Sequence, residues 1–153
     1  MLKKPIKSLK GKQIAIIAMG ASQVDFHMAI THSVEFDEVW VVNAMCGVVP
    51  NPDRAFVMDP MSRYLDTEDA GDMTNMMRKV LPKLKCPIYT CVLDERIPKT
   101  ELYPIESVIQ DSACSYLNNT VAYAIAFAYW NKVGGVNIFG ADFTYKSNLY
   151  FAE

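Results

Sequence analysis

The stretch QIAIIAMGAS at residues 13–22 decides the fold, because a buried strand and a tight turn follow one another in it. The uninterrupted apolar run within residues 13–19 is typical of a parallel strand that is covered on both faces. Gly20, Ala21 and Ser22 predict a tight turn, and apolar residues at helical spacing follow from Val24 to Ile30. The stretch therefore predicts a strand, turn and helix unit of an open α/β sheet.

Four further apolar runs end, like the first, at a small or polar residue. They cover residues 39–42, 55–58, 88–93 and 136–139, and the residues that follow them are Asn43, Asp59, Asp94 and Gly140, with Asp142 two positions later. Open α/β sheets bind ligands in the crevice outside the carboxyl ends of their strands. We therefore expect one rim of the sheet to carry the site, lined by Gly20, Asn43, Asp59 and Asp142.

The segments between these runs predict the connections. The stretch from 47 to 52 is too short for a helical crossover, so the second and third strands should be joined by a loop or a single turn. Residues 69–84 have apolar residues at helical spacing, with an acidic start and a basic end that suit the helix dipole. Residues 94–115 are expected to be a long loop with a short helix at 105–110. A strongly apolar helix follows at 121–132, capped by Asn119 or Thr120.

The composition of the chain limits the classes of protein to which it can belong. The chain has 153 residues, 51% hydrophobic and 21% charged, with a net charge of −2, so we expect one folded domain over 1–153 and no nucleic-acid partner. The four cysteines form no CxxC pair and are interpreted as reduced packing residues. No apolar run approaches the roughly 18 to 20 residues that span a bilayer, and no signal peptide is evident, which predicts a cytoplasmic protein. The abrupt end at 151–153 suggests a fragment of a longer chain.

Each candidate site residue has a functional and a plainer interpretation. The turn at Gly20 and Ser22 has backbone N–H groups that suit a phosphate, but it is also ordinary capping chemistry. Strand-end Asn43, Asp59 and Asp142 can contact a ribose or hold Mg²⁺ against phosphates, or can simply start turns. At least one of Asn118, Asn119 and Thr120 must cap the following helix, and the others are free to reach a ligand. Tyr145 either stacks on a base or packs under a loop. No dedicated metal cluster is predicted.

The sequence at these strand ends resembles a known superfamily. The matching strings are IIAMGAS at 16–22, EVWVVN at 38–43, FVMDP at 56–60, NTVAYA at 119–124 and IFGADFTY at 138–145. They are similar to the Rossmann-like superfamily of archaeal 6-hydroxymethylpterin pyrophosphokinases, motility-associated glycosyltransferase-like proteins and bacterial sialyltransferases, and above all to small bacteriophage and prophage proteins. The resemblance implies a three-layer sandwich around a mainly parallel five-stranded sheet in the order 3-2-1-4-5, in a protein that works in the host cytoplasm.

The resemblance also implies a function. A nucleotide or nucleotide-sugar would lie over the strand ends, with its phosphates at the Gly20 turn, its nucleoside at Asn43 and its reacting centre near Asp142. The leading hypothesis is therefore a glycosyl or pyrophosphoryl transferase, in which Asp142 or Asp59 holds a cation or acts as general base. The alternative is a non-catalytic phage protein that sequesters a host nucleotide signal or binds a host protein.

Overall fold

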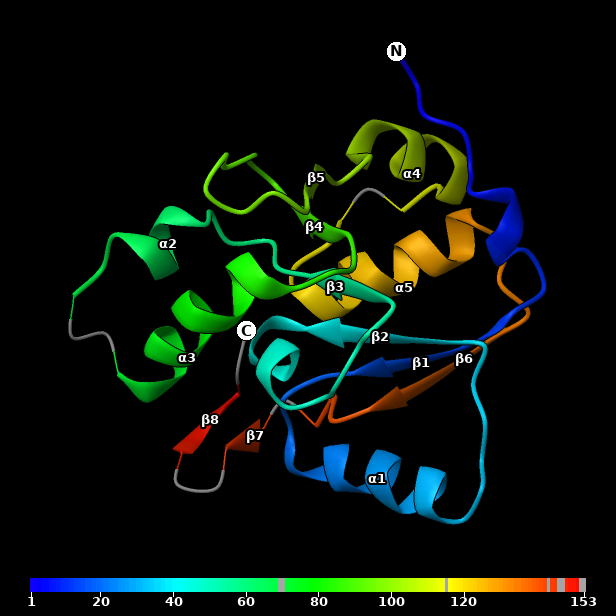
Figure 1. Cartoon of the computed structure of the whole chain (residues 1–153). Coiled ribbons are helices and arrows are strands. Elements are labelled where there is room, and N and C mark those ends of the chain that lie inside the picture. Colours follow the sequence, from blue (N-terminus) through cyan, green and yellow to red (C-terminus); the bar gives the residue numbers. More distant parts are fainter. Residues whose placement is uncertain (69–70, 115, 143, 146–147, 152–153) are drawn as a thin grey trace.

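The computed structural model describes residues 1–68, 71–114, 116–142, 144–145 and 148–151, and only the backbone course in the last two ranges. Six parallel strands form one sheet in the order β5-β4-β3-β2-β1-β6 (Figure 1). Their bounds are β1 Gln13–Ile17, β2 Glu38–Val42, β3 Arg54–Phe56, β4 Ile88–Thr90, β5 Thr100–Leu102 and β6 Gly135–Phe139. A short antiparallel pair, β7 (Thr144–Tyr145) and β8 (Asn148–Phe151), follows.

The predicted α/β class and parallel sheet are confirmed, but the predicted order 3-2-1-4-5 and the count of five strands are wrong. The strand predicted at 88–93 pairs with β3 instead of β1, and β6 occupies the position beside β1. A sixth strand, β5, lies in the segment predicted to be a loop. Consecutive strands are neighbours in most sheets, and the chain follows that rule from β1 to β5 before it returns across the sheet to β6.

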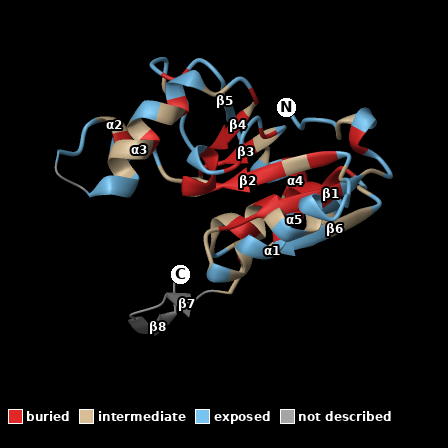
Figure 2. Cartoon of the chain, turned by 60° about the horizontal axis from the view of Figure 1, so that its bottom comes forward, coloured by how far each residue is buried: buried red, intermediate tan, exposed pale blue. Residues whose placement is uncertain are grey.

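Helices cover both faces of the sheet and make three layers. Alternate residues of β1 point to opposite faces, with Ala15 and Ile17 in one core and Ile14 and Ile16 in the other. The first face is covered by α1 (Val24–Thr31), α2 (Ser62–Leu65), α3 (Asp72–Val80) and the 3₁₀ turn η3 (Asn43–Gly47). The second face is covered by α4 (Ile105–Ser112), α5 (Thr120–Trp130) and the 3₁₀ turn η1 (Lys7–Leu9). The central strands are buried, whereas β6 is partly exposed at the edge (Figure 2).

The connections largely follow the sequence pattern. A single 3₁₀ turn, η3, joins β2 to β3, as predicted for so short a segment. The helix predicted at 69–84 is shorter, because α3 ends at Val80 and Leu81–Lys83 form a 3₁₀ turn, η4, that contains Pro82. Proline lacks the N–H that would continue an α-helix and its ring crowds the preceding turn. The predicted short helix in the next segment is α4, extended to Ser112.

Helix α5 packs on the second face through an aromatic cluster. Its Phe127 ring lies 4.5 Å from Tyr89 and 5.7 Å from Trp40, measured between ring centroids. Ala124 and Ala128 are fully buried and let the helix approach the sheet closely. Since α5 runs antiparallel to β6, its first residues lie at the carboxyl edge of the sheet.

A buried ionic group links β2 to β3 at the other edge. The Glu38 carboxylate accepts hydrogen bonds from Arg54 Nε at 2.9 Å and from Trp40 Nε1 at 2.7 Å. Burial acts to raise the pKa of Glu38, but the hydrogen bonds from Arg54 and Trp40 and the charges of Arg54 and Lys12 outweigh it and hold that pKa below its ordinary value. Glu38 therefore stays ionised within the fold.

The helices of the described residues are all too short or too polar to cross a membrane.

Candidate functional site

The backbones of β1 and β6 run close together beyond the carboxyl ends of the two strands. Ala18 donates its N–H to the carbonyl oxygen of Phe139 at 2.8 Å, and Gly20 donates to Gly140 at 2.7 Å. A Cβ on Gly20 would lie 2.5 Å from the Gly140 oxygen, so no larger residue fits. Gly140 has a positive φ of 75° and is equally crowded, by the carbonyl oxygen of Ala18. The absence of a side chain at Gly20 and at Gly140 therefore allows the two strand ends to lie in contact.

This contact lies at the switch point of the sheet. From β1 the chain builds outward through β2 to β5, and it then returns to the other side of β1 for β6. The helices that adjoin these strands, α1 and α5, lie on opposite faces (Figure 1). Ligands of open α/β sheets bind where the strand order reverses in this way.

Asp142 is fixed at the switch point by the turn that follows β1. Its Oδ2 accepts the backbone N–H of Ser22 at 2.7 Å, and its Oδ1 accepts the Ser22 hydroxyl. The Ser22 Oγ in turn accepts the N–H of Gly140 at 3.0 Å. Hydrogen bonds from the Ser22 hydroxyl and backbone N–H hold the pKa of Asp142 below its ordinary range, so it is a carboxylate at neutral pH.

The turn is thus complementary to an oxygen anion. Gly20 precedes a 3₁₀ turn, η2 (Ala21–Gln23), that continues directly into α1, so the N–H groups and the helix dipole favour negative charge. In this structure the negative charge is the Asp142 carboxylate. Of the two residues predicted to contact a phosphate, Gly20 donates its N–H to the Gly140 carbonyl oxygen, and Ser22 directs both its donors to Asp142.

Two amide side chains, one beyond β1 and one beyond β2, have buried oxygens without a hydrogen-bond partner among the described residues, Gln23 Oε1 and Asn43 Oδ1. Gln23 ends η2 and its Cβ lies 3.0 Å from where a Cβ on Gly140 would be. Asn43 directly follows β2 and has a positive φ of 51°. A buried acceptor without a donor is costly, so both oxygens are suited to accept from a ligand hydroxyl or amino group.

Asp59 follows β3 and is engaged elsewhere. Its Oδ2 accepts from Arg63 at 2.8 Å and from the Tyr64 hydroxyl at 3.2 Å. Strands β6 and β3 are three positions apart in the sheet, which corresponds to roughly 14 Å at the usual strand spacing. The four predicted rim residues do follow neighbouring strands, but Asp59 and Asp142 do not converge on one reacting atom.

The remaining predicted residues lie at the same edge with different roles. Asn119 is the N-cap of α5, and its Oδ1 accepts the N–H of Ala122 at 2.9 Å. Thr120 is the first residue of that helix. Tyr145 lies on β7, and its side chain is outside the described part of the chain.

Neither Gln23 nor Gly140 is among the site residues predicted from the sequence, although Gly140 is noted there as the end of an apolar run. Gly140 had a signal, because a glycine directly after an apolar run marks a sharp strand end. Gln23 had none, since glutamine in a first helical turn is ordinary. Among the described residues no group of three or more His, Cys, Asp or Glu side chains is arranged to hold a metal.

Comparisons with family models, curated proteins and solved structures found no match to this chain.

Proposed function

We propose that this chain binds a nucleotide or nucleotide-sugar over the carboxyl ends of β1, β2 and β6. The observation that carries the proposal is the pair of Ser22 donors that converge on the two Asp142 oxygens. Phosphate oxygens take the same donors as carboxylate oxygens do. The resemblance of the strand ends to Rossmann-like pyrophosphokinases and glycosyltransferase-like proteins supports the same ligand class.

The unpartnered oxygens extend the proposed site away from the phosphates. Asn43 follows β2, next to β1 in the sheet, so a nucleoside that extends from the Ser22 turn toward β2 would reach its Oδ1. The oxygen would accept from a ribose hydroxyl or from an amino group of the base. Gln23 would do the same closer to the phosphates.

The proposed reaction is transfer of a glycosyl or pyrophosphoryl group. The acceptor oxygen forms the new bond, the nucleotide leaves with the electrons of the broken bond, and the acceptor proton passes to Asp142. Asp142 is ionised at neutral pH and can therefore accept a proton, but the Ser22 hydrogen bonds that lower its pKa also weaken it as a base. A phosphate that takes over those two donors would make Asp142 the stronger base that the reaction needs. Mg²⁺ commonly takes one or two carboxylates together with substrate phosphates, so Asp142 also fits a cation that arrives with the nucleotide.

Thermal unfolding with a panel of nucleotides and nucleotide-sugars, each with and without Mg²⁺, tests the binding. A ligand at 100 times its Kd stabilises the native state by about 2.7 kcal/mol, which corresponds to a rise in Tm of roughly 5 to 10 °C for a chain of this size. We expect Ser22→Ala to reduce that rise and Ser62→Ala, at an exposed serine on α2, to leave it unchanged. Absence of a shift with every compound contradicts the proposal.

Turnover is tested separately from binding. We expect Asp142→Asn to keep a Tm shift but to lose product formation, whereas Asp72→Asn, at an exposed position on α3, should keep both. If the wild-type chain binds a nucleotide and leaves it intact with every acceptor tried, the transferase part is wrong and a sequestering role is favoured.

A further inference from the structure

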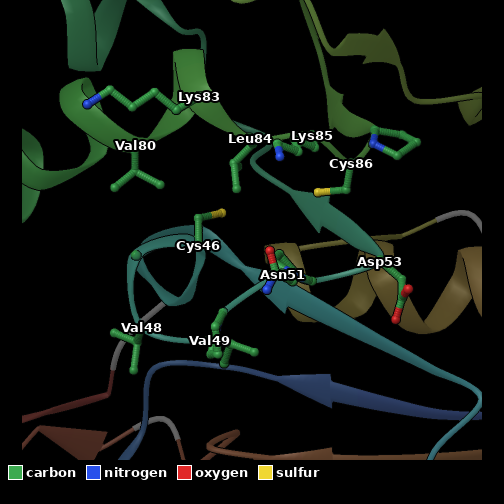
Figure 3. A pocket seen from close by; sticks show the side chains of 14 residues that line it. Cys46, Val48, Val49, Asn51, Asp53, Val80, Lys83, Leu84, Lys85 and Cys86 are labelled. Atoms are coloured by element: carbon green, nitrogen blue, oxygen red, sulfur yellow. The ribbon is translucent and has the colours of Figure 1, made fainter.

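A pocket of about 600 Å³ lies on the first face of the sheet, away from the switch point (Figure 3). One wall is the loop at 47–53, which leads into β3, and the other is the segment at 80–87, which leads into β4. Apart from Cys46 and Gly47, which belong to η3, the lining residues precede their strands, whereas the residues of the proposed nucleotide site follow theirs. The pocket is therefore distinct from the site described above.

Most of the pocket lining is apolar. Val49, Val80 and Leu84 form its walls, and the buried side chains of Cys46 and Cys86 lie between them. In Figure 3 the two thiols lie between the upper and lower walls. Burial, with a smaller contribution from Cys86, raises the pKa of the Cys46 thiol to about 12, so this part of the lining is uncharged at neutral pH.

Charge is concentrated at the rim. Lys83 and Lys85 both line the pocket and are exposed, and neither forms an ion pair within the described part of the chain. One acidic residue, Asp53, also lines the pocket, and its Oδ2 accepts the N–H of Val39 at 2.7 Å. The formal charge of the lining is therefore +1, from two lysines and one aspartate. A rim with a net positive charge beside an apolar cavity favours a ligand with one anionic end and one apolar end.

We propose that this pocket binds a small organic anion, with its apolar body between Val49, Val80 and Leu84 and its acidic group at the rim beside Lys85. Lys83, which points away from Lys85 in Figure 3, adds positive charge to the same rim. The volume lies within the roughly 300 to 1,000 Å³ of small-molecule sites, which are mostly apolar with a few polar groups that fix orientation. Side chains that are already held in place without a ligand lose little conformational entropy when a ligand binds. The buried Cys46, Val49 and Cys86 meet that condition.

The proposal is tested with three probes of one shape, namely octanoate, octan-1-ol and octylammonium. Titration followed by backbone amide NMR should show octanoate binding, with shifts at residues 46–53 and 80–87. It should bind about five-fold more tightly than octan-1-ol, because exposed ion pairs contribute modestly, and octylammonium should bind most weakly. Preference for octylammonium, equal binding of octanoate and octan-1-ol, or shifts confined to other residues overturns the proposal.

A matched pair of double variants measures the contribution of Lys83 and Lys85 to octanoate binding. The double variant K83Q/K85Q should bind octanoate about five-fold more weakly and octan-1-ol as the wild type does. The control K7Q/K10Q removes the same charge from exposed lysines near the N-terminus, which do not line the pocket, and should leave octanoate binding unchanged. Equal losses in both variants contradict a site at the rim. Nucleotide binding at Ser22 and Asp142 is measured independently, so either proposal can fail alone.

Discussion

Replacing Gly140 by alanine tests whether the contact between the two strand ends is as tight as the structure indicates. Gly140 has a φ of 75°, and an added Cβ would meet the Ala18 carbonyl oxygen and approach the Gln23 Cβ to 3.0 Å. Gly11 provides the matched control, because its φ is 80° but a Cβ there would have no atom within 4 Å. Both variants strain the backbone, and only one of them adds a steric clash.

The expected magnitudes follow from that difference. A left-handed backbone costs a residue with a Cβ about 1 to 2 kcal/mol, so Gly11→Ala should lower the free energy of unfolding by that amount. Overpacking adds typically 1 to 3 kcal/mol, so Gly140→Ala should lose roughly 2 to 5 kcal/mol in total. A clash with a backbone oxygen is relieved only by moving β1 or β6, which favours the upper half of that range.

Urea unfolding, followed by far-UV circular dichroism, measures both variants against the wild type. Unchanged m-values would show that the comparison is between native states of similar compactness. The reasoning is refuted if Gly140→Ala loses no more stability than Gly11→Ala, since the extra loss is attributed to crowding alone.

Two further predictions concern stability elsewhere in the fold. Asn119→Ala should cost about 1 kcal/mol in urea unfolding, because it removes the acceptor for the Ala122 N–H, whereas Asn118→Ala should have little effect; equal losses would contradict the capping role. The pKa of Glu38 is lower in the folded chain than its ordinary 4.5, so its contribution to stability is complete above that value and is lost as the pH falls through the folded-state pKa. Glu38→Gln, which leaves Arg54 without a charged partner, should therefore destabilise the chain at pH 7 and flatten the acid side of its stability profile. A profile as steep as that of the wild type would show that other groups dominate acid unfolding.

The strand positions could be predicted from the sequence because strands that are buried on both faces are continuous apolar runs. The runs that contain Ile14 to Ile17 and Val39 to Val42 are continuous and apolar, as central parallel strands require. Strand β5 has no such apolar run, since Glu101 and Leu102 are exposed at the edge of the sheet. A short edge strand has the composition of a loop.

Strand order depended on information that local sequence does not contain. Both the expected and the observed order satisfy the same apolar runs, and they differ in which strand lies beside β1. That choice is made by packing between distant segments, such as Phe127 of α5 against Trp40 and Phe56. The resemblance to Rossmann-like proteins supplied the order that the structure corrects.

The sequence predicted at which edge of the sheet the candidate site lies, but not the hydrogen bonds within the site. Glycine and aspartate at strand ends predicted the neighbourhood of Gly20 and Asp142, and the structure places them in contact. The hydrogen bonds from Ser22 to Asp142 depend on pairing between β1 and β6, which sequence spacing does not reveal. The prediction that all four cysteines are packing residues was partly wrong, because Cys91 is exposed.

The position of β1 has a consequence for the biosynthesis of this chain. Ser22 and Asp142 are separated by 120 positions, and the edge of β1 that pairs with β6 stays uncovered until β6 has been made. At about 5 to 20 residues per second, ribosomes need roughly 6 to 24 s to cover that distance. Through that interval the nascent chain exposes an apolar strand edge that can pair with other chains, so the yield of folded protein should depend on how well the cell shields it.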